Sequence, residues 1–206
     1  MSTVVHIIDK VTEWVSAEIC SKIKLKMPPD DNDGSNAAGY EYTLITPASF
    51  SFFLPSKDKL PPSIISPIPA VCVRPIGGTD NLVTSAGSLN IELAFSAWST
   101  GEHGKEIFVP DKENGLHFTQ GKETEYFQKS AEGWRDCWNW IDIALRAIAG
   151  SATINGIQID RATAVTYGQF TEQESIPDFY PFWFAWIHFS VNRQLIRNIP
   201  EYSDLL

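Results

Sequence analysis

Four histidines are the residues of this 206-residue chain best suited to bind a metal or move a proton near neutral pH. None of them belongs to an HExxH or HxxxH pair, which would place two imidazoles on one helix face. A metal site would therefore need ligands from distant segments. His188 lies inside an apolar stretch, which favours a histidine that is hydrogen-bonded in the core. The four positions are His6, His103, His117 and His188.

Two glycine–lysine sequences raise the possibility of phosphate binding, GEHGKE at 101–106 and GKE at 121–123. The P-loop pattern GxxxxGK[ST] needs a lysine for the phosphates and a following hydroxyl for Mg²⁺. Neither sequence has that glycine spacing or that hydroxyl. The chain therefore shows no nucleotide site of this kind.

Nucleophilic catalysis finds no support either. The chain contains no GxSxG elbow, and its cysteines, Cys20, Cys72 and Cys137, form no CxxC pair. Three scattered cysteines predict neither a disulfide framework nor a zinc knuckle. The carboxylate pair Glu172 and Glu174 lies in a polar stretch that suggests no rigid cleft.

The acidic sequence PPDDNDGSNAAG at 28–39 invites a calcium interpretation. If Gly34 takes the glycine position of an EF-hand loop, Pro29 falls at position 1 and Tyr40 at position 12. Neither residue supplies a carboxylate, so the segment is predicted to be a solvated loop. Taken together, the residues predict no enzyme, no cofactor and no metal.

Composition indicates a single soluble globular domain over residues 1–206, with 43% hydrophobic and 20% charged residues. The net charge of −9 argues against specific DNA binding, which needs a clustered basic surface. The longest apolar run is far shorter than the roughly 20 residues of a membrane helix, so no membrane contact is expected. A cytoplasmic, soluble product is the default expectation.

Helical spacing of apolar residues predicts a first helix over about 3–24, ended before Pro28-Pro29. The segment 40–55 predicts one strand, or two short strands broken at Pro47. A short strand over 70–77 is expected to close at the turn signal Gly77-Gly78. Residues 88–100 alternate as a half-buried antiparallel strand, with Leu89, Ile91, Leu93, Phe95 and Ala97 on one face.

Residues 99–129 are polar, with a small hairpin suggested by FVPDKENGLHF, and loops of this length are usually functional or flexible. A second helix is expected behind an N-cap at Ser130 and is predicted to stop at Gly150. Its predicted core face carries Trp134, Trp138, Ile141, Leu145 and Ile148.

The segment 153–170 predicts one or two strands, and 180–192 predicts the final strand of the sheet. Aromatic residues fall on both parities of this last strand, so both of its faces should be covered. We expect the second helix on one face. The other face should meet the first helix or a neighbouring subunit.

The order of these elements resembles the small tail-terminator, or tail-completion, proteins of tailed bacteriophages and phage-tail-like particles. The resemblance rests on PAVxVxPxGxxD at 69–80, the helix GWRDCWNWIDIALRAI and the ending YPFWFAWIHFSV, and spans about 69–193 plus the first helix. The chain carries additional loops at about 28–40 and 100–129.

The resemblance implies an α+β subunit with a mainly antiparallel mixed sheet and two principal helices, which assembles into a homo-hexameric ring in the virion. Such a ring caps the tail tube, stops tube elongation and joins the tail to the neck or connector protein. DNA would only pass through its lumen, without specific binding. Another neck or head-completion adaptor, or a tube-like subunit, is the alternative.

Interface residues are predicted among aromatic side chains that lie outside the expected core. Trp134, Trp138 and Phe184 are assigned to the core, whereas a second strand face is expected to bring other aromatics to a neighbour. The loop at 100–129 is expected to pack on a neighbour or on the tube. The predicted subunit or tube contacts are Trp98, Phe108, Phe118, Tyr126, Phe127 and Trp183.

A third possibility, from a different class, is a small-ligand-binding or enzymatic α+β domain. Its mark would be a deep pocket lined by convergent polar groups around His188 and Arg161.

Overall fold

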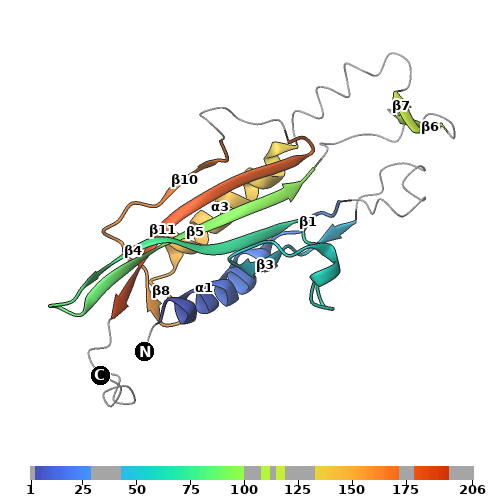
Figure 1. The fold of residues 1–206 in the computed structure, drawn as a ribbon. Helices are drawn as coiled ribbons and strands as arrows, with labels where there is room; N and C mark the ends of the chain where they lie inside the picture. Colours follow the sequence, from blue (N-terminus) through green and yellow to red (C-terminus); the bar gives the residue numbers. More distant parts are fainter. Residues whose placement is uncertain are drawn as a thin grey trace.

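A computed structural model describes residues 3–28, 43–99, 108–111, 115–118, 133–171 and 179–194, with the backbone alone for 108–111 and 115–118. Within these residues, two α-helices accompany a five-stranded mixed sheet whose pairs are mainly antiparallel. The fold is therefore α+β, as the sequence predicts (Figure 1). Neither of the described helices is long and apolar enough to cross a membrane.

Thr3 is the N-cap of helix α1 (Val4–Glu18), and its side-chain oxygen accepts a hydrogen bond from the His6 amide at 3.2 Å. A 3₁₀ turn, η1 (Cys20–Lys22), follows it, so the α-helix is shorter than the predicted 3–24. Its buried side chains are Ile7, Ile8, Val11, Trp14 and Val15.

Strands β1 (Leu25–Lys26) and β2 (Leu44–Ile45) pair with each other in antiparallel orientation. Strand β3 (Ala48–Ser51) follows β2 after Thr46 and Pro47 and runs parallel to β4. The sequence predicted either one strand or two short strands over 40–55, and the described residues of this segment form two short strands. Pro47 has no amide hydrogen and cannot continue a ladder.

Strands β4 (Ala70–Asn81) and β5 (Ala86–Trp98) form a long hairpin. The prediction that the first of them closes at Gly77-Gly78 is wrong. The pairing only shifts there, between Pro75 and Gly77, and the ladder continues to Asn81. A glycine inside a strand often marks a bulge, and Gly77, with φ of 155°, lies at this register shift. On β5 the predicted inward face is buried throughout.

Helix α3 (Trp134–Gly150) has Gly133 at its N-cap position, so the prediction of Ser130 as the cap is wrong. Its core face is also rotated from the predicted one. Trp134 is 41% exposed, which overturns its assignment to the core. The buried residues are Cys137, Trp140, Ile141, Ala144 and Ile148.

Three short strands precede the last one. β8 (Thr153–Ile154) and β9 (Ile157–Gln158) form a hairpin through Asn155-Gly156, both with positive φ. β10 (Thr166–Gln169) pairs with β11 (Phe182–Gln194), which pairs with β5 along its full length. The sheet order is β10-β11-β5-β4-β3. The predicted small hairpin is present as β6 (Phe108–Asp111) and β7 (Gly115–Phe118).

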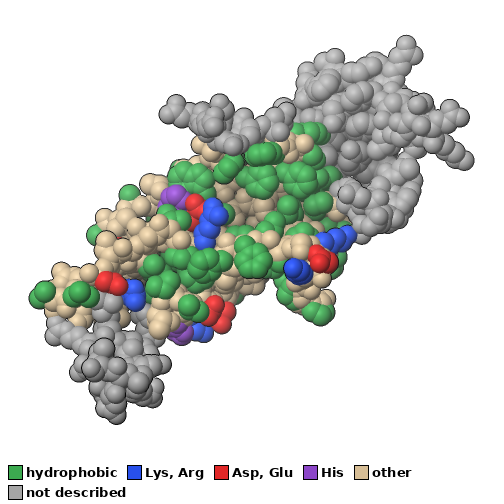
Figure 2. Space-filling view, viewed as in Figure 1, with side chains coloured by type: hydrophobic (Ala, Val, Ile, Leu, Met, Phe, Trp, Pro, Cys, Tyr) green, Lys and Arg blue, Asp and Glu red, His purple; other side chains and the backbone are tan. Residues whose placement is uncertain are grey.

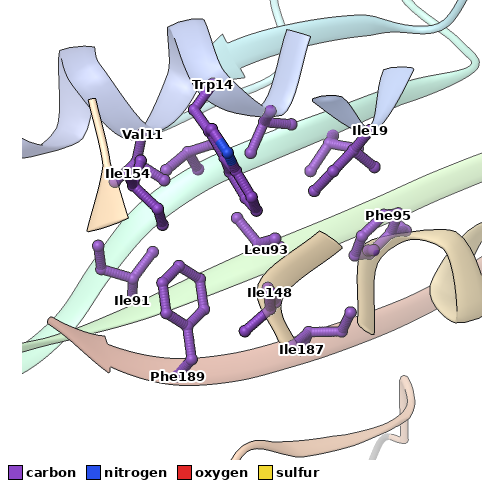
Figure 3. Packing of buried hydrophobic residues seen from close by; sticks show 14 of the residues in the cluster. Val11, Trp14, Ile19, Ile91, Leu93, Phe95, Ile148, Ile154, Ile187 and Phe189 are labelled. Carbon is purple, nitrogen blue, oxygen red and sulfur yellow. The ribbon is translucent and has the colours of Figure 1, made fainter. Parts of the chain in front are cut away.

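Both helices lie on the same face of the sheet, behind it in the view of Figure 1. The odd-numbered side chains of β11, from Ala185 to Val191, are nearly fully buried and join one core with α1 and α3 (Figure 3). The second helix therefore covers one face, as predicted. The first helix does not cover the other face.

The width of the sheet explains this arrangement. Five strands at about 4.8 Å spacing span about 19 Å, whereas a helix with its side chains is about 10 Å wide. One helix cannot cover that face alone. Helix α1 lies over β3 and β4, and α3 lies over β5 and β11.

Candidate interaction surfaces

The sheet face opposite the helices is the first candidate surface, here called the open face. On β11 it carries the even-numbered residues from Phe182 to Ser190, opposite the even-numbered residues of β5. Figure 2 shows hydrophobic side chains gathered along it. No described helix covers it, and several of its apolar side chains remain partly exposed, although Ala70 and Trp98 are buried. The partly exposed side chains include Phe50, Cys72, Ala94, Phe182, Phe184 and Trp186.

One polar cluster interrupts the open face. The Glu92 carboxylate accepts a hydrogen bond from Arg74 Nε through one oxygen, and its other oxygen lies 2.7 Å from His188 Nε2. The His188 ring stacks on Trp186 with 4.1 Å between centroids. His188 is hydrogen-bonded, as predicted, but it lies on the open face and not in the core. The cluster links three strands, because Arg74 lies on β4, Glu92 on β5 and His188 on β11.

The edge of the sheet at β10 carries exposed aromatic side chains. Tyr167, Phe170 and Phe179 are between 43% and 52% exposed. The Phe170 and Phe179 rings lie 6.3 Å apart, and Phe179 meets Phe184 edge-on at 5.6 Å. Phe170 and Phe179, named the β10-edge surface, continue the aromatic character of the open face to its margin. Tyr167 is the register partner of Ile187 and lies on the helix-covered face, near Trp138 of α3.

The opposite edge, at β3, carries a second exposed apolar group, named the β3-edge surface. Phe52, Phe53 and Ile65 are between 55% and 69% exposed. Ile65 also lines a groove of about 590 Å³ between the β2–β3 segment and residues 63–66. Such large apolar groups on a surface usually mark a contact with another molecule.

The tip of the β4–β5 hairpin is also apolar. Leu82 and Val83 are 82% and 79% exposed, although the turn itself is well ordered by hydrogen bonds. Asn81 Oδ1 accepts from the amides of Val83 and Thr84, each at 3.0 Å. An organised turn that presents two aliphatic side chains to solvent is suited to contact a partner.

The two ends of the second inserted loop lie against each other. Ser99 precedes the loop, and its carbonyl accepts a hydrogen bond from Trp183 Nε1 at 2.8 Å. Gly133 follows the loop, and a Cβ there would lie only 2.5 Å from that same carbonyl. Lys26 Nζ donates to Ser99 Oγ at 3.1 Å and lies 3.4 Å from Asp136. These contacts hold together the residues that precede and follow the loop, and they are called the base of the loop.

The predicted interface residues fall in different places. Trp98 lies on the open face but is only 5% exposed, so the subunit itself already covers most of it. Trp183 lies on the helix-covered face, partly buried against the core, and not on the second face as expected. Phe184, which the sequence assigned to the core, lies instead on the open face and is partly exposed. The placements of Trp98 and Trp183 leave their predicted contact with a neighbouring subunit untested.

The remaining four predicted residues belong to the inserted loop. Phe108 and Phe118 are register partners in the β6–β7 hairpin, of which only the backbone is described. Tyr126 and Phe127 lie outside the described residues. Their predicted contact with a neighbour or with the tube stays a prediction.

Sequence reasoning missed both edge surfaces, although one signal was available. Phe52, Phe53 and Leu54 are consecutive, and successive side chains of a strand point to opposite faces. Three apolar residues in a row before Pro55 therefore cannot all enter one core. The β10-edge residues gave no comparable signal, because they are separated by polar residues.

Reactive chemistry is scarce in the part of the chain that the structure describes. No group of three or more His, Cys, Asp or Glu residues there could hold a metal ion. Burial raises the pKa of the Cys20 and Cys137 thiols to about 12, which keeps them protonated. Arg161 lines a pocket of about 360 Å³, from which His188 is absent. Its guanidinium donates to the carbonyls of Ala149 and Ser151 at the end of α3.

Charge is divided unevenly along the chain. The described residues contain 11 Lys and Arg against 10 Asp and Glu, a net charge of +1. The remaining residues contain 5 against 15, a net charge of −10. The net acidity of the protein therefore comes from residues outside the described ranges, while the described helix-and-sheet body is nearly neutral.

No known protein-family model matches this chain, and no curated protein is significantly similar to it.

Proposed function

We propose that the chain is a structural virion protein that closes into a homo-hexameric ring at the end of a phage-type tail tube. The ring stops the addition of tube subunits and joins the tail to the neck or connector protein. It acts without a cofactor and without catalysis. It is located in the tail and neck of the virion, after assembly in the host cytoplasm.

The observation that carries this proposal is the open face of the sheet. A subunit that leaves Phe50 of β3 and Phe182, Phe184 and Trp186 of β11 partly exposed gains by covering them with protein. Apolar burial contributes roughly 25 cal/mol per Å², so a few aromatic side chains suffice to drive association. The further exposed groups at both sheet edges supply the different surfaces that a cyclic assembly requires.

The distribution of charge also fits a ring around a DNA channel. Specific DNA binding needs a clustered basic surface, and the body carries almost no net charge. DNA would pass through the lumen without being held. The acidic segments would further weaken any attachment to phosphates.

The alternative within the same machinery is a neck or head-completion adaptor, or a tube-like subunit. The apolar surfaces would serve such a protein equally well, because it too contacts several neighbours. The difference lies in what controls tail length, and that is where the experiment is aimed.

The experiment compares tails made with and without this protein, measured by electron microscopy. Without a terminator, tubes are expected to continue growing, so tail lengths should spread well beyond the normal value. Without an adaptor, tails of normal length should accumulate unattached to heads, and that result would exclude the terminator role. Supplying the intact chain in trans should restore a single length and serves as the control.

A further inference from the structure

The described residues that flank the two inserted loops meet at one corner of the body. Lys26 and Met27 precede the first loop, and the described chain resumes after it at Thr43. Ser99 precedes the second loop, and Gly133 follows it. Strand β1, which ends at Lys26, packs against β5, which ends just before Ser99 (Figure 1). The starting points of both loops therefore lie side by side.

One lysine side chain connects these starting points. Lys26 Nζ donates a hydrogen bond to Ser99 Oγ at 3.1 Å and lies 3.4 Å from Asp136 Oδ2, in the first turn of α3. The Lys26 side chain is only 15% exposed, and Ser99 is fully buried. An ammonium group taken out of water is costly unless charged and polar partners surround it. The position of Lys26 is therefore stabilised by groups that precede and follow the second loop.

The strands at the first loop are short. β1 and β2 pair through two residues each, and the Met27 amide extends this pairing by donating to the Thr43 carbonyl at 2.8 Å. This pair is called the base of the first loop. Two short strands outside a larger sheet are marginally stable, so the pair depends on what anchors β1 to the body. The buried Leu25 supplies an apolar anchor, and Lys26 supplies a polar one.

We propose that Lys26 couples the base of the first loop to the base of the second, so that a displacement at one base loosens the other. Lys26 is a positioning residue, because it acts through the groups that it holds. Members of one hydrogen-bond and ion-pair network affect stability non-additively, since the loss of one member weakens the contacts of the others. The inference goes beyond the proposed function, because it does not depend on what either loop contacts.

Hydrogen exchange of the full chain, followed by NMR, tests the coupling. Asp136→Asn removes the carboxylate charge at the second loop, and the readout is the Met27 amide at the first loop. This amide should exchange about ten-fold faster, which lies within the range over which members of one network affect each other. Lys26→Met should accelerate exchange at Met27 and also at the Trp183 indole, which donates to the Ser99 carbonyl.

A double variant separates the coupling from local effects. In the Lys26→Met background, Asp136→Asn should have no further effect on the Met27 amide, because the group that transmits the change is already absent. Lys22→Met is the matched control, because it removes only an ion pair with Glu18 in which both side chains are more than half exposed. This variant should leave exchange at both bases unchanged.

Three results would overturn the coupling. The first is a Met27 amide that exchanges equally fast in the intact protein and in Asp136→Asn. The second is a rise at Met27 that is matched at the Leu93 amide in the buried part of β5, because it would report a general loss of stability. The third is an equal effect of Lys22→Met. If Lys26→Met does not fold, Ser99→Ala replaces it, removes only the hydroxyl contact and should accelerate Met27 exchange by a smaller factor.

Discussion

Replacing Gly133 by alanine tests the fixed base of the second inserted loop. A Cβ at this position would lie 2.5 Å from the Ser99 carbonyl oxygen and 2.9 Å from Trp183 Nε1. Carbon atoms do not approach so closely, and the nearer neighbour is backbone. Either the chain before the loop or the indole must move, and movement of the indole breaks its 2.8 Å hydrogen bond to Ser99.

The expected cost follows from these two effects. Overpacking costs about 1–3 kcal/mol, and the lost hydrogen bond adds about 1 kcal/mol. Alanine restricts the unfolded chain more than glycine does, and this effect stabilises the folded protein by about 0.4–1 kcal/mol. The net loss for Gly133→Ala should therefore be about 1–3 kcal/mol of unfolding free energy.

Urea denaturation followed by tryptophan fluorescence measures this loss. Gly150→Ala is the matched control at the other end of α3, because a Cβ there meets no atom within 4 Å. It should leave stability unchanged or raise it by up to about 1 kcal/mol, since alanine favours helix. Equal stabilities of the two variants would refute the close approach of Ser99 and Gly133.

Three further predictions concern the core, the open face and the loop. Trp140→Ala should cost about 3–5 kcal/mol in urea unfolding because the indole is fully buried against Phe95, whereas Trp134→Ala should cost less than about 1 kcal/mol; equal losses would show that the wrong face of α3 is assigned to the core. A thiol reagent at pH 8 should label Cys72 first. Cys72 is only partly buried, and Arg74 offsets part of the rise that burial causes in its pKa, whereas burial raises the pKa of the other two thiols to about 12. Assembly should protect Cys72. Unchanged labelling on assembly would remove the open face from the contact. Deletion of 103–126 should leave a folded subunit, by circular dichroism, that assembles or docks poorly, and normal tube capping by this variant would contradict the role of the loop.

Local patterns predicted most of the elements, because each depends on residues close in sequence. The alternation of β5 named its buried face correctly, and the turn-rich centre of FVPDKENGLHF predicted the β6–β7 hairpin. Gly77-Gly78 misled because a glycine pair suits both a turn and a bulge. The choice depends on whether β5 offers partners beyond it, and only the fold supplies that information.

The arrangement of the faces was beyond local reasoning. Both parities of β11 are apolar, so periodicity alone could not decide whether Trp183 or Phe184 faces the helices. On α3 the predicted and the observed buried stripes share Ile141 and Ile148, but the helix buries Trp140 and leaves Trp134 exposed. Both stripes have helical spacing, so the period alone could not choose between them.

Imaging of the tail end in assembled particles tests the central claim most directly. The account predicts six copies of this chain in a closed ring around the end of the tube, with the open face and both sheet edges covered by protein. A particle that carries the chain as isolated single copies, or that has no such ring at the tube end, would contradict it.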